Sequence, residues 1–179
     1  MYDKFMVFDV EFIGLHGDAF AYGYVVVDRD GNELDCGQNC MNPNHARGTA
    51  DDRVWVSGNI PTLPHTIGTG GDLRSLFWGD WTYWRQKGAV LACDCAWPVE
   101  AKFLLECVRD DHWRSSVAPY PLLDVSGFIL AAGGDPTACF NRRENELPSH
   151  HPLRDARQSA RLLLEAMNAI RDNRVFDPS

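Results

Sequence analysis

Three strand-like segments follow one another at the start of the chain, and they limit the fold more than any other feature. Residues 5–12 and 19–28 are rich in β-branched and aromatic side chains. The turn-forming stretch DRDGN then separates residues 19–28 from a third run at 33–41. Short connections of this kind join antiparallel neighbours, so we expect the chain to begin as an antiparallel sheet.

Strand and helix patterns alternate after a long connection at residues 42–70, which is rich in Pro, Gly, Asn and Thr. Apolar spacing and turn residues predict, in order, a helix from 71 that stops at Gly88, a strand at 89–93, a helix that starts at Pro98, a strand at 120–125, a short helix at 126–132 and a periodic helix at 151–171. The expected fold is therefore α/β: a mixed five-stranded sheet flanked by helices, with strand–helix alternation after three antiparallel strands.

The length of the chain favours a single domain over residues 1–179, and its 45% hydrophobic and 11% aromatic content favours a globular one. No apolar run approaches the ~18 residues that cross a bilayer, and no basic-then-apolar leader pattern opens the chain. We therefore expect a cytoplasmic protein with no membrane partner. The net charge of −8 disfavours a general nucleic-acid coating protein, because such proteins neutralise phosphates with basic residues. The same net charge is compatible with an enzyme whose bound cations neutralise the negative charge of its active site.

Two groups of residues have a structural interpretation that we prefer to a functional one. Trp78, Trp81 and Trp84 have the three-residue spacing of a base-stacking surface, but core packing of an amphipathic helix is the favoured interpretation. Cys93 and Cys95 have no second pair to complete a four-ligand zinc site. We expect the six cysteines to be reduced and mostly buried.

Asp9 and Glu11 stand inside the first strand-like run. Side chains alternate between faces along a strand, so these carboxylates project from one face and Val10 from the other. Two neighbouring buried carboxylates repel each other and lose hydration, at a cost of several kcal/mol. Either this face is exposed and both acids are solvated, or it holds a cation; hard divalent ions such as Mg²⁺ and Mn²⁺ prefer these oxygen ligands.

Three further acids and a histidine stand where α/β folds gather ligands. Asp94 follows the strand at 89–93, and Glu100 falls in the first turn of the next helix. His150 precedes Asp155 by five positions at the start of the last helix. Each has a structural alternative, because acids complement the dipole of a first helical turn and a loop histidine is solvated. Their order and spacing together favour a functional site.

These motifs resemble those of the DEDD-type 3′–5′ exonucleases, which have a ribonuclease H-like fold, and more narrowly the DEDDh subgroup. FDVEF (8–12) matches the first motif, and HHPLRDA (150–156) matches the last, with His150 in the general-base position and Asp155 in a metal-ligand position. The resemblance extends from residue 5 to about 170. The DVEFI wording and compact length also resemble a small exoribonuclease-like branch.

The second motif departs from the family pattern. In CDCAWPVEAKFL (93–104), aligning Phe103 gives Glu100 as the acidic ligand, whereas aligning the strand end gives Asp94. We prefer Asp94 and keep Glu100 open. The hydroxyl residues that usually follow the first motif are replaced by Phe12 and Ile13, which we expect to bind substrate by wedging against its last base.

The resemblance implies a two-metal hydrolase. Two Mg²⁺ or Mn²⁺ ions would be held by Asp9, Glu11, Asp155 and one of the two second-motif acids, with His150 as general base. Phosphodiester bonds at a single-stranded 3′ end would be hydrolysed to nucleoside 5′-monophosphates, and RNA is favoured over DNA on the resemblance alone. Relatives are often homodimers, so a homodimer is a further expectation by analogy.

Two rival functions keep the same residues. One is a catalytically silent protein that binds nucleic-acid 3′ ends, and the other is a phosphoesterase acting on small nucleotides. The loops beside the expected site carry arginines that we interpret mostly as solvated, with phosphate contact as the alternative: Arg47, Arg53, Arg142, Arg143 and Arg154.

Overall fold

The computed structural model describes residues 2–178, in which the strands form one mixed five-stranded sheet. The strands are β1 (Lys4–Phe12), β2 (Ala19–Asp28), β3 (Glu33–Cys40), β4 (Ala89–Cys93) and β5 (Leu123–Asp124), in the order β3-β2-β1-β4-β5. β1, β2 and β3 pair antiparallel, whereas β4 is parallel to both β1 and β5. The expected class, strand number and mixture of pairings are confirmed. β5 is shorter than the expected 120–125 because only two residues pair with β4.

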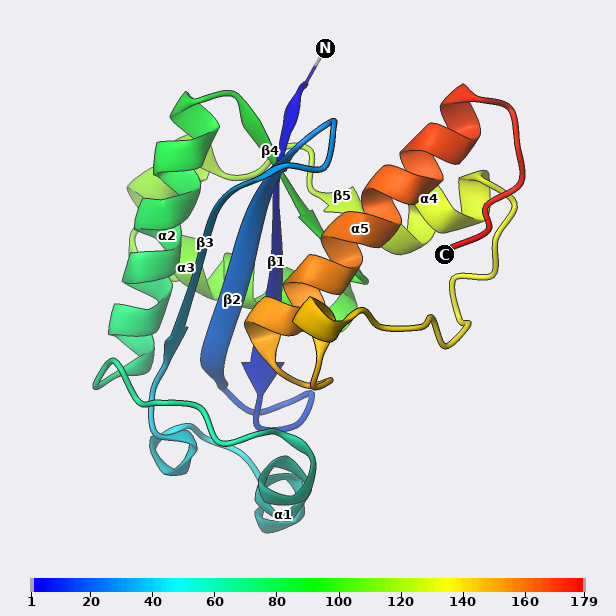
Figure 1. Cartoon of the computed structure of the whole chain (residues 1–179). Helices are drawn as coiled ribbons and strands as arrows, with labels where there is room; N and C mark the ends of the chain where they lie inside the picture. The colour runs from blue at the N-terminus through cyan, green and yellow to red at the C-terminus, as the bar shows by residue number, and fades with distance from the viewer. Residues whose placement is uncertain (1, 179) are drawn as a thin grey trace.

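Helices cover both faces of the sheet (Figure 1). They are α1 (Ala50–Asn59), α2 (Gly70–Gln86), α3 (Ala101–Asp110), α4 (Val125–Ala131) and α5 (Pro152–Arg171). α2 and α3 lie on one face and α4 and α5 on the other, while α1 lies beyond the carboxyl end of β1. In residues 2–178, none of these helices combines the length and apolar character that crossing a bilayer requires.

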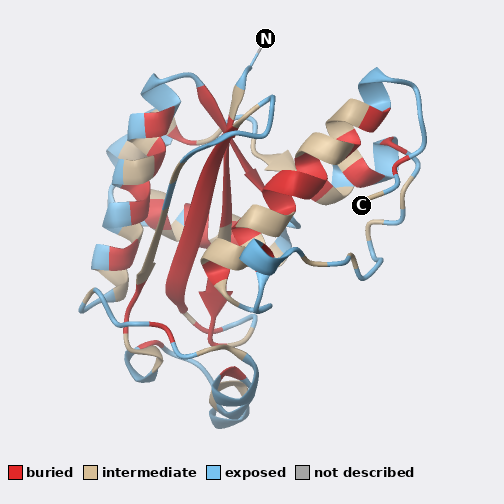
Figure 2. Cartoon of the chain, viewed as in Figure 1, coloured by how far each residue is buried: buried red, intermediate tan, exposed pale blue. Residues whose placement is uncertain are grey.

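Alternating side chains of β1 contribute to two separate cores, one on each face of the sheet. The central strands are buried along most of their length (Figure 2). Phe8 and Val10 pack with Phe77 of α2 and Phe103 of α3, while the opposite face packs against α4 and α5. Three α2 tryptophans are 7% exposed or less, so their core assignment is confirmed: Trp78, Trp81 and Trp84. α2 ends where Gly88 adopts φ +86°, the left-handed conformation that glycine tolerates.

The long connection at 42–70 contains a helix that the sequence pattern did not predict. Thr49 and Asp52 cap α1 reciprocally, since each side chain accepts a hydrogen bond from the other's backbone N–H. Only Val56 of α1 is buried. A helix with so little core contact leaves a weak apolar pattern in the sequence, which is why no helix was predicted within the long connection.

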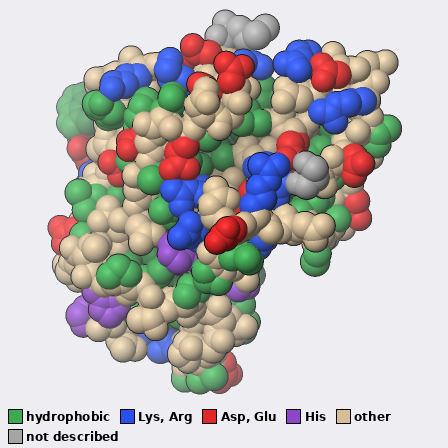
Figure 3. All heavy atoms as spheres, viewed as in Figure 1, with side chains coloured by type: hydrophobic (Ala, Val, Ile, Leu, Met, Phe, Trp, Pro, Cys, Tyr) green, Lys and Arg blue, Asp and Glu red, His purple; other side chains and the backbone are tan. Residues whose placement is uncertain are grey.

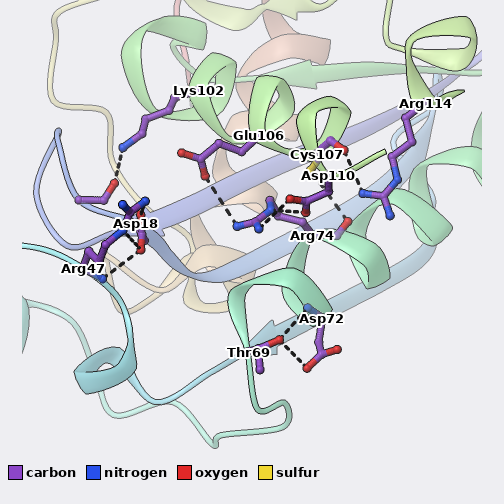
Figure 4. A network of polar contacts seen from close by, with 11 residues as sticks. Asp18, Arg47, Thr69, Asp72, Arg74, Lys102, Glu106, Cys107, Asp110 and Arg114 are labelled. Atoms are coloured by element: carbon purple, nitrogen blue, oxygen red, sulfur yellow. Dashed lines mark hydrogen bonds and ion pairs between the residues drawn. The ribbon is translucent and has the colours of Figure 1, made fainter. Parts of the chain in front are cut away.

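A network of charged side chains ties the turn after β1 to α3 (Figure 4). Lys102 donates to the carbonyl oxygen of Gly17, and its ammonium lies 4.9 Å from the centroid of the Phe12 ring. On the same side of the molecule, Arg74 of α2 pairs with Asp110 of α3 at 2.6 Å. The Lys102 contacts link the turn that follows the first acidic motif to the helix that follows the second, and the Arg74–Asp110 pair links that helix to α2.

Gly23 allows the start of α5 to lie directly on the sheet. It is paired with Asp9 across the β1–β2 ladder. A Cβ built at this position would lie 2.2 Å from the backbone nitrogen of Leu153 and 2.5 Å from the backbone carbon of Pro152. Because backbone atoms cannot move aside as a flexible side chain does, only glycine admits the helix here. The contact brings the first turn of α5 beside the end of β1.

We predict that Gly23→Ala lowers the free energy of unfolding by about 1–3 kcal/mol, because the added methyl group overpacks a backbone contact. Urea denaturation measures the change. Gly79→Ala is the matched control: its Cβ meets no atom within 4 Å, and alanine stabilises a helix interior by roughly 0.5–1 kcal/mol. Equal stability of the two variants would contradict the close approach of α5.

Candidate active site

The acidic motifs meet at the edge of the sheet where β1 and β4 end. These strands are parallel, so their carboxyl ends share one edge, and the start of α5 reaches the same edge over Gly23. Asp9 and Glu11 project toward the face covered by α5, and Glu11 is only 9% exposed. The interpretation of this face as exposed, with both acids simply solvated, is therefore wrong.

Glu11, His150 and Asp155 form the candidate metal cluster. One ligand atom from each residue lies within 4.8 Å of the ligand atoms of the other two. Among residues 2–178, this is the one group of three or more potential metal ligands whose atoms lie this close together. Residues from the first strand and from the start of the last helix are thus brought together, as the spacing of the motifs predicts.

Asp9 lies outside this group of three but interacts electrostatically with four other acids at the same edge. Burial raises its pKa well above the ordinary value, and neighbouring carboxylates raise it further. Those neighbours are, in decreasing order of effect, Glu11, Glu100, Asp155 and Asp94. Burial, and then the charge of Asp155, also raise the pKa of Glu11 to about 7. The site therefore concentrates carboxyl groups whose charged forms lack hydration and repel one another.

The structure brings both second-motif candidates to this edge. Burial raises the pKa of Glu100 to about 8, although backbone hydrogen bonds, including one from Val10, oppose the rise. Asp94 is more exposed; burial and then Asp124 and Asp155 raise its pKa. Glu100 thus interacts with the backbone of β1 at Val10, and Asp94 interacts with Asp155 of α5. Both act on Asp9, so the choice between them stays open.

The helical backbone after β4 begins at Pro98, as expected from the sequence, and Glu100 lies within it; regular α-helical hydrogen bonding starts only at Ala101. α3 begins at Ala101, after a wide turn at Ala96–Glu100 in which Trp97 keeps an extended backbone (φ −107°, ψ 135°). The amide N–H of Ala96 donates to Asp124 at 3.0 Å and anchors this turn. This conformation points the Glu100 side chain into the protein, where Glu100 is 8% exposed.

His150 is held in an unusual backbone conformation. Its φ of +57° lies in the left-handed region, which costs a residue other than glycine roughly 1–3 kcal/mol and is enriched at functional sites. The backbone N–H of His150 donates to Asp155 Oδ2 at 3.0 Å. Arg142 Nη1 lies 2.5 Å from Asp155 Oδ1, so both oxygens of this carboxylate have donors.

Trp55 of α1 is a site residue that the sequence analysis did not identify. Its ring centroid lies 5.3 Å from that of His150, in an edge-to-face arrangement, and the residue is 48% exposed. The Thr49–Asp52 capping pair was the signal in the sequence, because it marks the helix that carries Trp55. α1 thus places a half-exposed aromatic surface beside the imidazole.

Phe12 and Ile13 have packing roles in this structure. Phe12 is 6% exposed and belongs to the core beneath α2 and α3, whereas Ile13 is fully buried beneath α1. The Ile13 side chain has no exposed part, so it cannot wedge against a substrate base as predicted. The reason is that the turn after β1 folds back under residues 46–48 instead of opening toward the site.

Each of the five loop arginines has a partner within the protein. Arg47 pairs with Asp18, Arg142 with Asp155 and Arg143 with Glu165, and the other two donate to backbone carbonyls. Basic side chains gather over the start of α5 (Figure 3). A cavity of about 250 Å³ beside the middle of α5 is lined by arginines and by acids that pair with them, including Arg157 with Glu33. Its charges are thus balanced internally.

The cysteines are all free, as expected, but only half of them are buried. Cys40, Cys93 and Cys107 are buried, whereas the other three are exposed. No cysteine belongs to the candidate metal group found among residues 2–178. The donor set is instead carboxylate oxygen with one imidazole, which fits a hard divalent cation such as Mg²⁺ or Mn²⁺.

Comparison with known proteins adds no relatives to this picture. No protein-family model and no curated protein matches the chain significantly.

We predict that the metal-free protein loses stability as pH rises from about 5 to 8. The pKa of Glu11 rises on folding from 4.5 to about 7, and that of Glu100 from 4.5 to about 8. In this window the folded chain binds more protons than the unfolded chain, so the free energy of unfolding falls as pH rises. Calorimetric melting temperatures, recorded with a metal chelator present, measure the trend.

Glu11→Gln is the control for this trend. Burial lowers the pKa of His151, which acts in the opposite direction, so the difference between wild type and variant isolates Glu11. The wild-type melting temperature should fall more steeply with pH than that of Glu11→Gln. Parallel curves would show that Glu11 titrates as it does in water.

Proposed function

We propose that this protein is a metal-dependent 3′–5′ exonuclease with a ribonuclease H-like fold. The observation that carries the proposal is the meeting of Glu11, His150 and Asp155 within 4.8 Å, together with the half-buried Asp9, whose pKa these acids raise. The residues that converge follow one another along the chain in the same order as the DEDDh motifs. The mixed sheet, with three antiparallel strands before two parallel ones, supports the ribonuclease H-like identity.

Carboxylates of the site are suited to hold a pair of Mg²⁺ or Mn²⁺ ions. Asp9, Glu11 and Asp155 would hold them together with either Asp94 or Glu100. Bound divalent ions lower the pKa of a coordinated water and stabilise charge on phosphate oxygens. They would also neutralise the concentrated negative charge, which reconciles a nucleic-acid substrate with a chain of net charge −8.

His150 is suited to remove a proton from the attacking water. Imidazole changes protonation between pH 5 and 8, which makes it an effective base near neutral pH. Its backbone N–H is bonded to Asp155 and its ring contacts Trp55. The first contact fixes the backbone of His150 at the acidic group, and the second positions its imidazole.

The substrate we propose is the 3′ end of a single strand, hydrolysed to nucleoside 5′-monophosphates. A half-exposed Trp55 beside the general base offers a face on which an unpaired terminal base can stack. RNA remains favoured over DNA on the resemblance alone. The homodimer and the cytoplasmic location are likewise part of the proposal.

We predict that His150→Ala lowers the rate of oligonucleotide hydrolysis by about 10²–10⁴-fold while Mn²⁺ binding, measured by calorimetry, is largely retained. The assay follows RNA and DNA oligonucleotides with a labelled 5′ end, with Mg²⁺, Mn²⁺ or a chelator. His112→Ala is the control, because His112 is exposed and follows the far end of α3. Full activity in His150→Ala would show that another group is the base.

The same assay distinguishes the rival functions. An exonuclease shortens the oligonucleotide stepwise from its 3′ end, whereas a silent binding protein protects that end. A small-nucleotide phosphoesterase cleaves a mononucleotide ester and leaves the oligomer intact.

We predict that Trp55→Ala weakens substrate binding. Base–aromatic stacking contributes about 1–3 kcal/mol, so KM should rise roughly 5–150-fold with a smaller change in kcat. Trp113→Ala is the matched control, because Trp113 is 74% exposed beyond the end of α3. Unchanged KM in Trp55→Ala would show that Trp55 only supports the imidazole.

A further inference from the structure

Arg142 places a permanent positive charge inside the acidic group. Its Nη1 lies 2.5 Å from Asp155 Oδ1 and also donates to the carbonyl oxygen of Glu146 at 2.9 Å. The two side chains of this ion pair are 23% and 16% exposed. Because a guanidinium stays protonated at any physiological pH, this charge is present in the folded protein throughout the neutral range.

The effect of Arg142 reaches beyond its ion pair. Its charge also lowers the pKa of Asp94, against the opposing effects of burial, Asp124 and Asp155. Arg142 therefore interacts with acids from two sides of the site, one after β4 and one in α5. A cation at this position relieves the repulsion that several closely spaced carboxylates would otherwise suffer.

A divalent ion on Asp155 would have to share that carboxylate with Arg142. Oδ2 accepts the backbone N–H of His150, and Oδ1 accepts Arg142. A metal ion and a guanidinium on the same carboxylate repel each other strongly at low dielectric. The guanidinium can move into solvent, because Arg142 lies in the connection between α4 and α5 and is partly exposed.

We propose that Arg142 is an internal counter-ion that competes with divalent metal for Asp155: it pairs with the carboxylate when no metal is bound and is displaced when metal binds. The inference rests on the proposed metal site and adds a residue that sets its affinity. Metal binding then replaces the guanidinium of Arg142 on Asp155 with a divalent ion, so Asp155 is paired with a cation in both states.

Calorimetric titration of Mn²⁺ into the nucleotide-free full chain tests this exchange. Arg142→Gln should bind Mn²⁺ about 10-fold more tightly than wild type, which corresponds to about 1.4 kcal/mol. Arg142→Lys keeps the charge and should stay close to wild type. Arg143→Gln is the matched control, because the adjacent Arg143 pairs at 3.1 Å with Glu165, which is not among the proposed ligands; its affinity should stay within about twofold.

Thermal unfolding gives a second readout that does not depend on activity. Without metal, Arg142→Gln should melt below wild type because the acids lose their counter-ion. With saturating Mn²⁺ the difference should shrink. Circular dichroism establishes that each variant is folded, and Arg142→Lys reports on the charge if Arg142→Gln fails to fold.

The sign of the affinity change decides between competition and support. If Arg142 instead orients Asp155 for the metal, Arg142→Gln binds Mn²⁺ more weakly, and the proposal is overturned while the metal site stands. Equal affinities of wild type and Arg142→Gln also overturn it. If neither wild type nor any variant binds Mn²⁺, the metal site of the proposed function itself is contradicted.

Discussion

Repulsion among carboxylates gathered at one edge of the sheet is the constraint on which the rest of this structure depends. Asp9 is half-buried within reach of four other acids, and its partial loss of hydration already disfavours its charge. A fold does not keep such an arrangement without compensation, because each unpaired buried charge costs several kcal/mol. In residues 2–178 the compensation visible in side chains is Arg142 on Asp155, together with carboxyl groups whose pKa values are raised.

The topology explains why the acids meet. β1 and β4 are parallel neighbours, so the residues that follow them leave the sheet at the same edge. α5 arrives from the far end of the chain and can reach that edge because Gly23 presents bare backbone to Leu153. The left-handed backbone of His150 then turns its N–H toward Asp155. Sheet order, one glycine and one strained residue thus assemble side chains that are distant in sequence.

Much of this arrangement could be predicted from the sequence, because the signals were local. The β-branched run at 19–28 coincides with β2, and the apolar run at 89–93 coincides with β4. The spacing of His150 and Asp155 predicted their proximity because both stand at one helix start. Asp9 and Glu11 were predicted to share a face, and whether that face was exposed depended on where α5 packs.

The features that could not be predicted depend on tertiary contacts. α1 buries a single residue, so no apolar periodicity marked it or its Trp55. Arg142 was indistinguishable from its neighbour Arg143, because only the folded connection shows which of them reaches Asp155.

Diffraction from crystals soaked in Mn²⁺, recorded near the manganese absorption edge, tests the central claim most directly. The account predicts anomalous peaks about 2.0–2.3 Å from carboxylate oxygens of Asp9, Glu11 and Asp155, at the shared ends of β1 and β4. Soaked crystals with no manganese at this edge, or with manganese bound only elsewhere, would contradict the claim that these acids form a divalent-metal site.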